Sequence, residues 1–184
     1  MNEYKIREVN TTTDKTGTEN NLFPVFLKLE DLRVLLVGGG NVAIEKLKAV
    51  IQNSPSTSIH IVSLTINEKI YALASEYPNI TIEQKPYALS DLEDVDIVIA
   101  AVNDISTSKQ ISDDAHKKGK LVNVADKPEL CDFYMGSIVK KGNLKIAIST
   151  NGKSPTIAKR LKEVIHNMIP EEMDGKWLRS AVTS

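Results

Sequence analysis

The stretch from Arg33 to Ala43, RVLLVGGGNVA, decides the fold of this 184-residue chain. Four apolar residues in a row precede the glycines, and such a run is what a strand buried on both faces requires. Apolar positions at helical spacing follow from Val42 to Ile51, with charged residues between them. A strand, a glycine turn and a helix in this order predict the first unit of a parallel α/β sheet.

The remaining chain repeats this alternation. Strands are predicted at 59–63, 80–84, 94–101 and 121–124, and helices at 67–76 and 107–117. The pattern predicts an α/β fold with a Rossmann-type, doubly wound parallel sheet. Beyond Asp126 it changes to two strands, 133–140 and 144–149, around Lys-Gly-Asn, and to a helix from Ser154-Pro155 to about Met168.

The two ends of the chain differ in sequence pattern from the part between them. Residues 1–21 are polar without a hydrophobic period and are predicted to be a disordered tail, and LFPVFLKL at 22–29 is strand-like. One more short helix is expected before Ser184. We therefore expect a Rossmann domain at 22–130 and a small β/helical extension at 131–184.

Composition limits the function classes. The net charge is −1 and hydrophobic residues make up 41%, so nothing in the bulk charge indicates nucleic acid or an anionic membrane as partner. Cys131 is the single cysteine and the three histidines are far apart, which excludes an intrachain disulfide and gives no metal-ligand spacing. Neither a signal peptide nor an apolar membrane span is visible, and a cytoplasmic protein is expected.

The turn GGGNVA from Gly38 to Ala43 matches G-x-G-x-x-A in the context that nucleotide binding requires. Gly38 permits the tight turn, Gly40 lets the backbone approach a pyrophosphate, and Ala43 allows close helix–sheet packing. The second strand ends without the acid that usually holds the ribose, so the choice between NAD and NADP stays open. A glycine turn in a Rossmann relative that binds no nucleotide is the alternative.

Asp126 directly follows the strand at 121–124. Open α/β sheets bind ligands at the carboxyl ends of their strands, and a carboxylate there can take a proton from a substrate. A turn-forming aspartate before Lys-Pro is the structural alternative.

Five segments together resemble the precorrin-2 dehydrogenase family, which also occurs as the N-terminal module of siroheme synthases. They are FPVFLKL, VLLVGGGNVAIEKL, IVIAAVND, VNVADKPELCDFYMGSIV and LKIAISTNGKSPTIAKRLKE, covering about residues 22–170. The resemblance implies NAD-dependent oxidation of precorrin-2 to sirohydrochlorin, with Fe²⁺ insertion in some members, and a homodimer formed through the region after Ser149. The helix at 155–168 carries an apolar stripe that suits such an interface.

The resemblance also implies the roles of particular residues. Asp126 is the expected catalytic carboxylate; the expected cofactor-binding residues are Gly38, Gly40, Asn41, Val42, Leu64, Thr65, Ala101 and Asn103; the expected substrate-binding residues are Thr150, Lys153 and Ser154. No residue is expected to hold a metal, since iron would be a substrate held by the macrocycle. Two features depart from the family: Gly136 stands where proline is common, and the helical C-terminal part is shorter.

Two other functions remain open at this stage. A Rossmann module that senses a nucleotide and signals to a partner explains the glycine turn equally well, but not the DKPELCDFY and STNGKSP segments. A chain that binds NAD but has lost turnover is the third reading.

Overall fold

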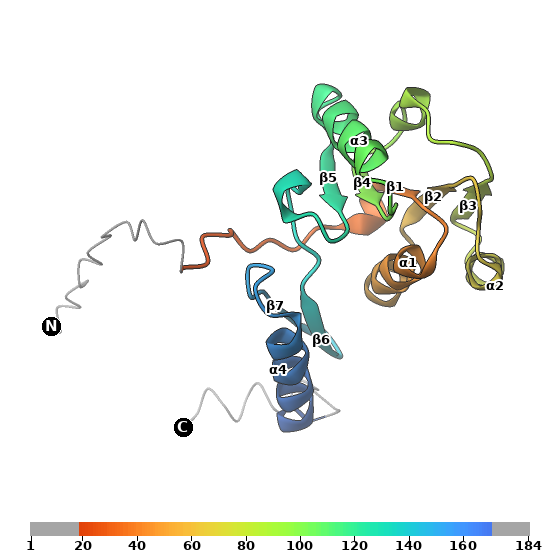
Figure 1. The fold of residues 1–184 in the computed structure, drawn as a ribbon. Helices are drawn as coiled ribbons and strands as arrows, with labels where there is room; N and C mark the ends of the chain where they lie inside the picture. The colour runs from red at the N-terminus through yellow and green to blue at the C-terminus, as the bar shows by residue number, and fades with distance from the viewer. Residues whose placement is uncertain (1–18, 171–184) are drawn as a thin grey trace, which may run out of the picture.

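The computed structural model describes residues 19–170. Its centre is a five-stranded, fully parallel sheet with the strand order β3-β2-β1-β4-β5 (Figure 1). The strands are β1 (Arg33–Val37), β2 (Ser58–Val62), β3 (Ile80–Glu83), β4 (Ile97–Ala100) and β5 (Leu121–Val124). The order changes direction between β1 and β4, so the predicted doubly wound Rossmann-type sheet is confirmed.

Helices cover both faces of the sheet because side chains alternate along each strand. α1 (Asn41–Asn53) and α2 (Glu68–Glu76) pack on one face, where Val34 and Leu36 meet Leu47 and Ile70. α3 (Ile105–Lys117) covers the opposite face, which Leu35 and Val37 line. The β1 residues are at most 2% exposed from Val34 to Val37, as the apolar run predicts.

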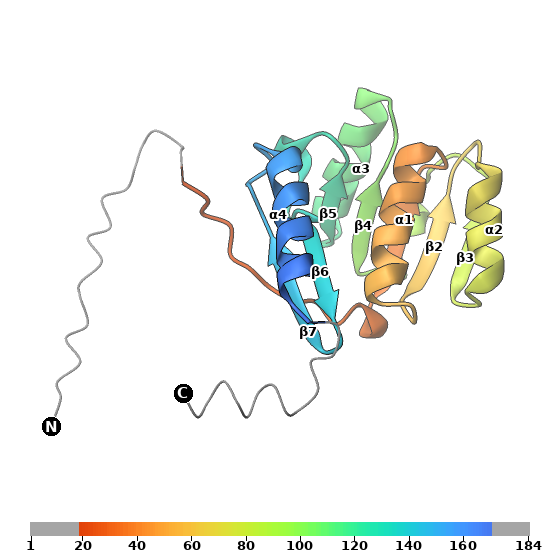
Figure 2. The same ribbon diagram turned by 90° about the horizontal axis from the view of Figure 1, so that it is seen from below.

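The extension after the sheet is a hairpin with a helix on it. β6 (Ser137–Lys141) and β7 (Leu144–Ile148) pair antiparallel, and α4 (Pro155–Met168) packs against them through the buried Ala158. The hairpin and α4 lie next to β5, away from β3 (Figure 2). The Lys145 ammonium donates to the Asn53 carbonyl at the end of α1, 2.8 Å away, which ties the hairpin to the first unit.

Two expected strands differ from the structure. Residues 22–28 form no strand, and Phe23 and Phe26 are 86% and 68% exposed, because nothing in the described chain pairs with or covers this apolar segment. β6 begins at Ser137 rather than at residue 133, since the backbone from 131 to 133 is still bound to β5. The short helix expected before Ser184 lies outside the described residues.

Candidate cofactor and active site

The glycine turn is packed against its neighbours at two of its three glycines. Gly38 adopts φ +127°, and a Cβ on it would overlap the carbonyl oxygen of Ala101. A Cβ on Gly39 would overlap the carbonyl oxygen of Thr65, and the Gly39 carbonyl accepts the Asn67 N–H at 2.9 Å. These two positions therefore require glycine for the protein's own packing.

Gly40 is different, because a Cβ there would meet no atom within 4 Å. Gly40 is the N-cap residue of α1, no side chain caps this helix, and its first turn holds no acidic residue. The other three α-helices of the described chain have side-chain caps, from Asn67, Asp104 and Ser154. The free N–H groups and the open space at Gly40 fit the pyrophosphate of a dinucleotide.

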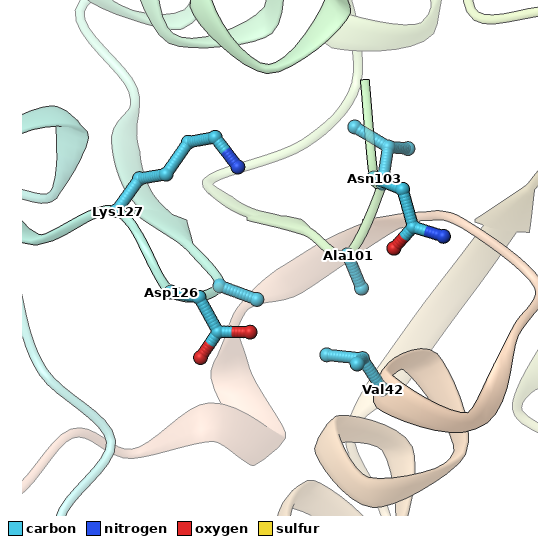
Figure 3. A pocket seen from close by; sticks show the side chains of 7 residues that line it. Val42, Ala101, Asn103, Asp126 and Lys127 are labelled. Atoms are coloured by element: carbon cyan, nitrogen blue, oxygen red, sulfur yellow. The ribbon is translucent and has the colours of Figure 1, made fainter. Parts of the chain in front are cut away.

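An open pocket lies beside this helix start, at the carboxyl ends of β4 and β5. Its lining residues are Val42, Ala101, Val102, Asn103, Ala125, Asp126 and Lys127 (Figure 3). Backbone hydrogen bonds bring them together: Ala101 N–H donates to Val37 O at 2.7 Å, and Ala125 N–H donates to Ala100 O at 2.9 Å. The pocket is therefore at the point where the strand order reverses, the usual ligand position in open α/β sheets.

Asp126 holds an unusual backbone conformation, with φ +59°. Aspartate is among the few residues besides glycine that adopt this left-handed region readily. The side chain is exposed, it lines the pocket, and no hydrogen bond joins its carboxylate to any residue from 19 to 170. A carboxylate in this position is available to a bound substrate.

Cys131 closes the turn that carries Asp126. Its sulfur accepts the Val124 N–H at 3.1 Å and lies 3.1 Å from the Val124 carbonyl oxygen and 3.3 Å from that of Lys127. Burial raises the pKa of this thiol, so it remains protonated and donates to one of the two carbonyls. The cysteine thereby fixes both ends of the turn.

Asp104 caps α3 next to the pocket residue Asn103. Its carboxylate accepts hydrogen bonds from the Ser106 hydroxyl at 2.6 Å and from the Thr107 N–H and hydroxyl at 2.6 and 2.7 Å. The bonds from Ser106 and Thr107 lower the pKa of Asp104 from 3.8 to about 2. This carboxylate is occupied in capping, and the N-terminus of α3 is not open to an anion.

The structure brings some of the expected site residues together and leaves others apart. Val42, Ala101, Asn103 and Asp126 line one pocket, and Gly38, Gly40 and Asn41 form the adjoining turn. Leu64 and Thr65 follow β2, on the other side of that turn, and both are exposed. Their position suits the adenosine half of a dinucleotide, because the turn lies between them and the pocket.

The expected substrate residues lie elsewhere. Thr150, Lys153 and Ser154 belong to the loop between β7 and α4 and do not line the pocket. The Thr150 hydroxyl bonds the Ser154 backbone at 3.1 and 3.3 Å, and the Ser154 hydroxyl accepts the Ile157 N–H at 3.3 Å. Both hydroxyls thus order the start of α4, and a role toward substrate stays a prediction.

Three pocket residues were not expected from the sequence: Val102, Ala125 and Lys127. Each is adjacent in the chain to an expected residue, so the signal was proximity to Asp126 or to Asn103. Only the fold shows that Lys127 lines the same pocket as the aspartate before it.

Comparison with known proteins matches two family models to consecutive parts of the chain. The model described as putative NAD(P)-binding matches residues 25–137, and that of the central part of the sirohaem biosynthesis protein matches residues 141–168. The chain belongs to the NAD(P)-binding family of siroheme biosynthesis proteins. This assignment confirms the family expected from the sequence and supports NAD as the cofactor.

Two curated relatives of the chain are much longer than the chain itself. The siroheme synthase of Psychrobacter cryohalolentis is 38% identical over 151 residues, which cover 82% of this chain and 28% of that protein. The siroheme synthase of Nitrosomonas eutropha is 36% identical over 148 residues, covering 80% and 31%. The chain thus spans about a third of the length of these relatives.

A solved structure of a family member agrees with the fold. SirC, a precorrin-2 dehydrogenase, superposes with a TM-score of 0.68 at 29% identity and covers 82% of this chain and 72% of its own. The matched 82% of the chain is more than the stretch from β1 to β5, so the match reaches beyond the sheet.

Proposed function

We propose that this chain catalyses the NAD-dependent oxidation of precorrin-2 to sirohydrochlorin. The observation that carries the proposal is the placement of Asp126, a carboxylate without a partner in the described chain, in the pocket beside the uncapped start of α1. The relatives named as siroheme synthases and as a precorrin-2 dehydrogenase support the substrate. None of these relatives is named as a nucleotide sensor, which leaves that alternative without support.

The oxidation removes one hydride and one proton from precorrin-2 and yields sirohydrochlorin, NADH and H⁺. Bound NAD⁺ supplies the hydride acceptor. The backbone of Gly40 and Asn41 would hold the pyrophosphate, while Val42 and Ala101 form an apolar wall where the nicotinamide would lie. Asp126 accepts the proton that leaves the macrocycle, a general-base step worth about 10²–10⁴-fold in rate.

We also propose that the same site can insert Fe²⁺ into the product. Two pyrrole N–H protons must leave when Fe²⁺ enters the ring, and Asp126 is the carboxylate that lines the pocket. Within residues 19–170, no three His, Cys, Asp or Glu side chains gather to hold a metal ion. Iron would be a substrate that the macrocycle itself binds.

The assembly we propose is a cytoplasmic homodimer. Residues 22–130 would bind the cofactor, and residues 131–184 would dimerise and shape the substrate site. The support is an apolar face of α4 that the described chain leaves open: Ile157, Leu161, Val164 and Met168 are 43–76% exposed at helical spacing. A contiguous apolar face of this kind usually marks an interface. None of the helices in residues 19–170 is long and apolar enough to cross a membrane.

The experiment that tests the function uses Asp126→Asn. Asparagine keeps the size of the side chain and also tolerates a positive φ, so the melting temperature should stay within a few degrees of wild type. Single-turnover oxidation of precorrin-2, followed by absorbance, should slow by about 10²–10⁴-fold, while the NAD⁺ affinity measured by calorimetry stays the same. Near-wild-type turnover by the folded variant would remove Asp126 from the mechanism, and absent turnover by the wild type would refute the function.

A further inference from the structure

Lys127 enters the pocket of Asp126 without a partner for its charge. Its side chain is half-buried, and no hydrogen bond or ion pair joins its ammonium to any residue between 19 and 170. Two other half-buried lysines of the described chain are bound, since Lys85 pairs with Asp91 at 2.7 Å and Lys145 donates to the Asn53 carbonyl at 2.8 Å. Lys46 and Lys120 are half-buried as well and form no side-chain hydrogen bond or ion pair within residues 19–170, but neither lines the pocket of Asp126. Because the side chain lines the pocket and its ammonium is not engaged within the described chain, Lys127 is available to an anionic group of a bound ligand.

The base of the Lys127 side chain is held firmly. Its N–H donates to the Val124 carbonyl at 3.3 Å, and its own carbonyl accepts the Leu130 N–H at 3.0 Å and lies 3.3 Å from the Cys131 sulfur. The residue therefore has a fixed backbone, and only the flexible stem of the side chain must be ordered when a ligand binds. This lowers the entropic cost of recruiting the lysine to a bound anion.

The position of the side chain indicates which anion it meets. Figure 3 shows Asp126 and Lys127 on the side of the pocket opposite Val42 and Asn103, with the Asp126 carboxylate and the Lys127 ammonium pointing in different directions from the turn. Lys127 follows β5, whereas the turn that fits the pyrophosphate follows β1, and β4 lies between these two strands. The lysine is thus on the side of the pocket remote from the pyrophosphate turn, where the substrate of the proposed reaction must approach the aspartate.

We propose that Lys127 binds a carboxylate on the periphery of the tetrapyrrole substrate and so orients the reacting carbon toward Asp126. This inference rests on the proposed function. Precorrin-2 carries carboxylates around its ring, and one of them lies near any carbon that reaches the pocket. A charge-assisted hydrogen bond at this partly exposed site selects a polycarboxylate over an apolar ring of the same size.

The test compares Lys127→Met with Lys127→Arg, and with Lys109→Met as a matched control. Lys109 is exposed on α3 outside the pocket, so its replacement removes the same charge without touching the site. We expect Lys127→Met to raise the KM for precorrin-2 about 10-fold, with a smaller change in kcat, since the site is half-exposed and salt screens it. The arginine variant should restore KM to within about 3-fold of wild type, because it keeps the charge.

Two binding measurements, with NAD⁺ and with the product, distinguish a role of Lys127 toward the substrate from a role toward the cofactor. Calorimetry with NAD⁺ should give the same Kd for wild type and Lys127→Met; a parallel loss would place Lys127 on the cofactor and overturn the proposal. An unchanged KM, or an equal rise in Lys109→Met, would overturn it too. If the wild type does not oxidise precorrin-2, the proposed function fails, and titration with sirohydrochlorin still tests Lys127, because the product carries the same carboxylates.

Discussion

Replacing Gly40 by aspartate should weaken NAD⁺ binding without lowering the stability of the fold. Gly40 has φ −92° and ψ −165°, an extended conformation that any residue adopts, and a Cβ there would meet no atom within 4 Å. Aspartate is also a better N-cap than glycine by a few tenths of a kcal/mol. We therefore expect the free energy of unfolding to stay within about 0.5 kcal/mol of wild type or to rise slightly.

The same substitution should weaken NAD⁺ binding strongly. The new carboxylate would cap the N–H groups of α1 and thus occupy the donors that the pyrophosphate needs. At about 4 Å, two unit charges near a protein surface repel by about 4 kcal/mol, and salt at this exposed turn reduces the value. An increase of about 100-fold in Kd, equivalent to about 2.7 kcal/mol, is the expected result.

Calorimetry with NAD⁺ and thermal melts measure both quantities on the same samples. Gly40→Asn is the matched control, because asparagine caps a helix as well but carries no charge. Its Kd should rise by less than that of the aspartate variant, and the difference between the two should shrink at high salt. If Gly40→Asp is folded and binds NAD⁺ as tightly as wild type, the assignment of the cofactor site is wrong.

Two further predictions concern the proposed dimer interface on α4 and the loss of folding stability at low pH. Leu161→Glu on the open face of α4 should convert a dimer to a monomer in light scattering at micromolar concentration; a monomeric wild type would contradict the proposed assembly. Asp104→Asn should remove a pH-dependent part of the stability, because a carboxylate whose pKa falls from 3.8 to about 2 on folding stabilises the fold above pH 4 and loses this effect between pH 4 and 2. Urea unfolding of both proteins at pH 5 and pH 2 should show their difference shrinking with acid, and a constant difference would argue against the cap as its cause.

The sheet could be predicted from the sequence because each of its strands is encoded locally. The apolar runs of β1 and β4 are buried on both faces, and a continuous apolar run is what such burial requires. The segment at 22–28 has the same composition, yet Phe23 is 86% exposed. The composition of a segment shows that it is apolar, but not which part of the structure covers it.

The glycine turn shows how far a motif can be interpreted. The motif assigns roles to Gly38 and Gly40, and the structure adds Gly39, whose missing Cβ makes room for the Thr65 carbonyl. This contact joins the turn to the chain after β2. The G-x-G-x-x-A motif describes only local spacing, so it does not predict a contact with a distant residue. The open space at Gly40, by contrast, agrees with the motif, because no atom of the described chain would meet a Cβ there.

In the turn after β5, successive residues of the segment ADKPELC (125–131) have distinct structural roles. Asp126 tolerates the left-handed backbone that aims its carboxylate into the pocket, and Pro128 begins the short helical turn that follows. Cys131 then closes the loop on Val124 and Lys127, so the geometry around the carboxylate is set within eight residues. The position of Asp126 could be predicted from the sequence because it directly follows the strand at 121–124, whereas the contacts of Cys131 could not. What the local contacts do not specify is the neighbour across the pocket: Val42 and Asn103 come from other units, and only the reversal of strand order between β1 and β4 brings them to the same opening. A substitution that shifts β4 should therefore weaken catalysis without changing any residue of the aspartate turn.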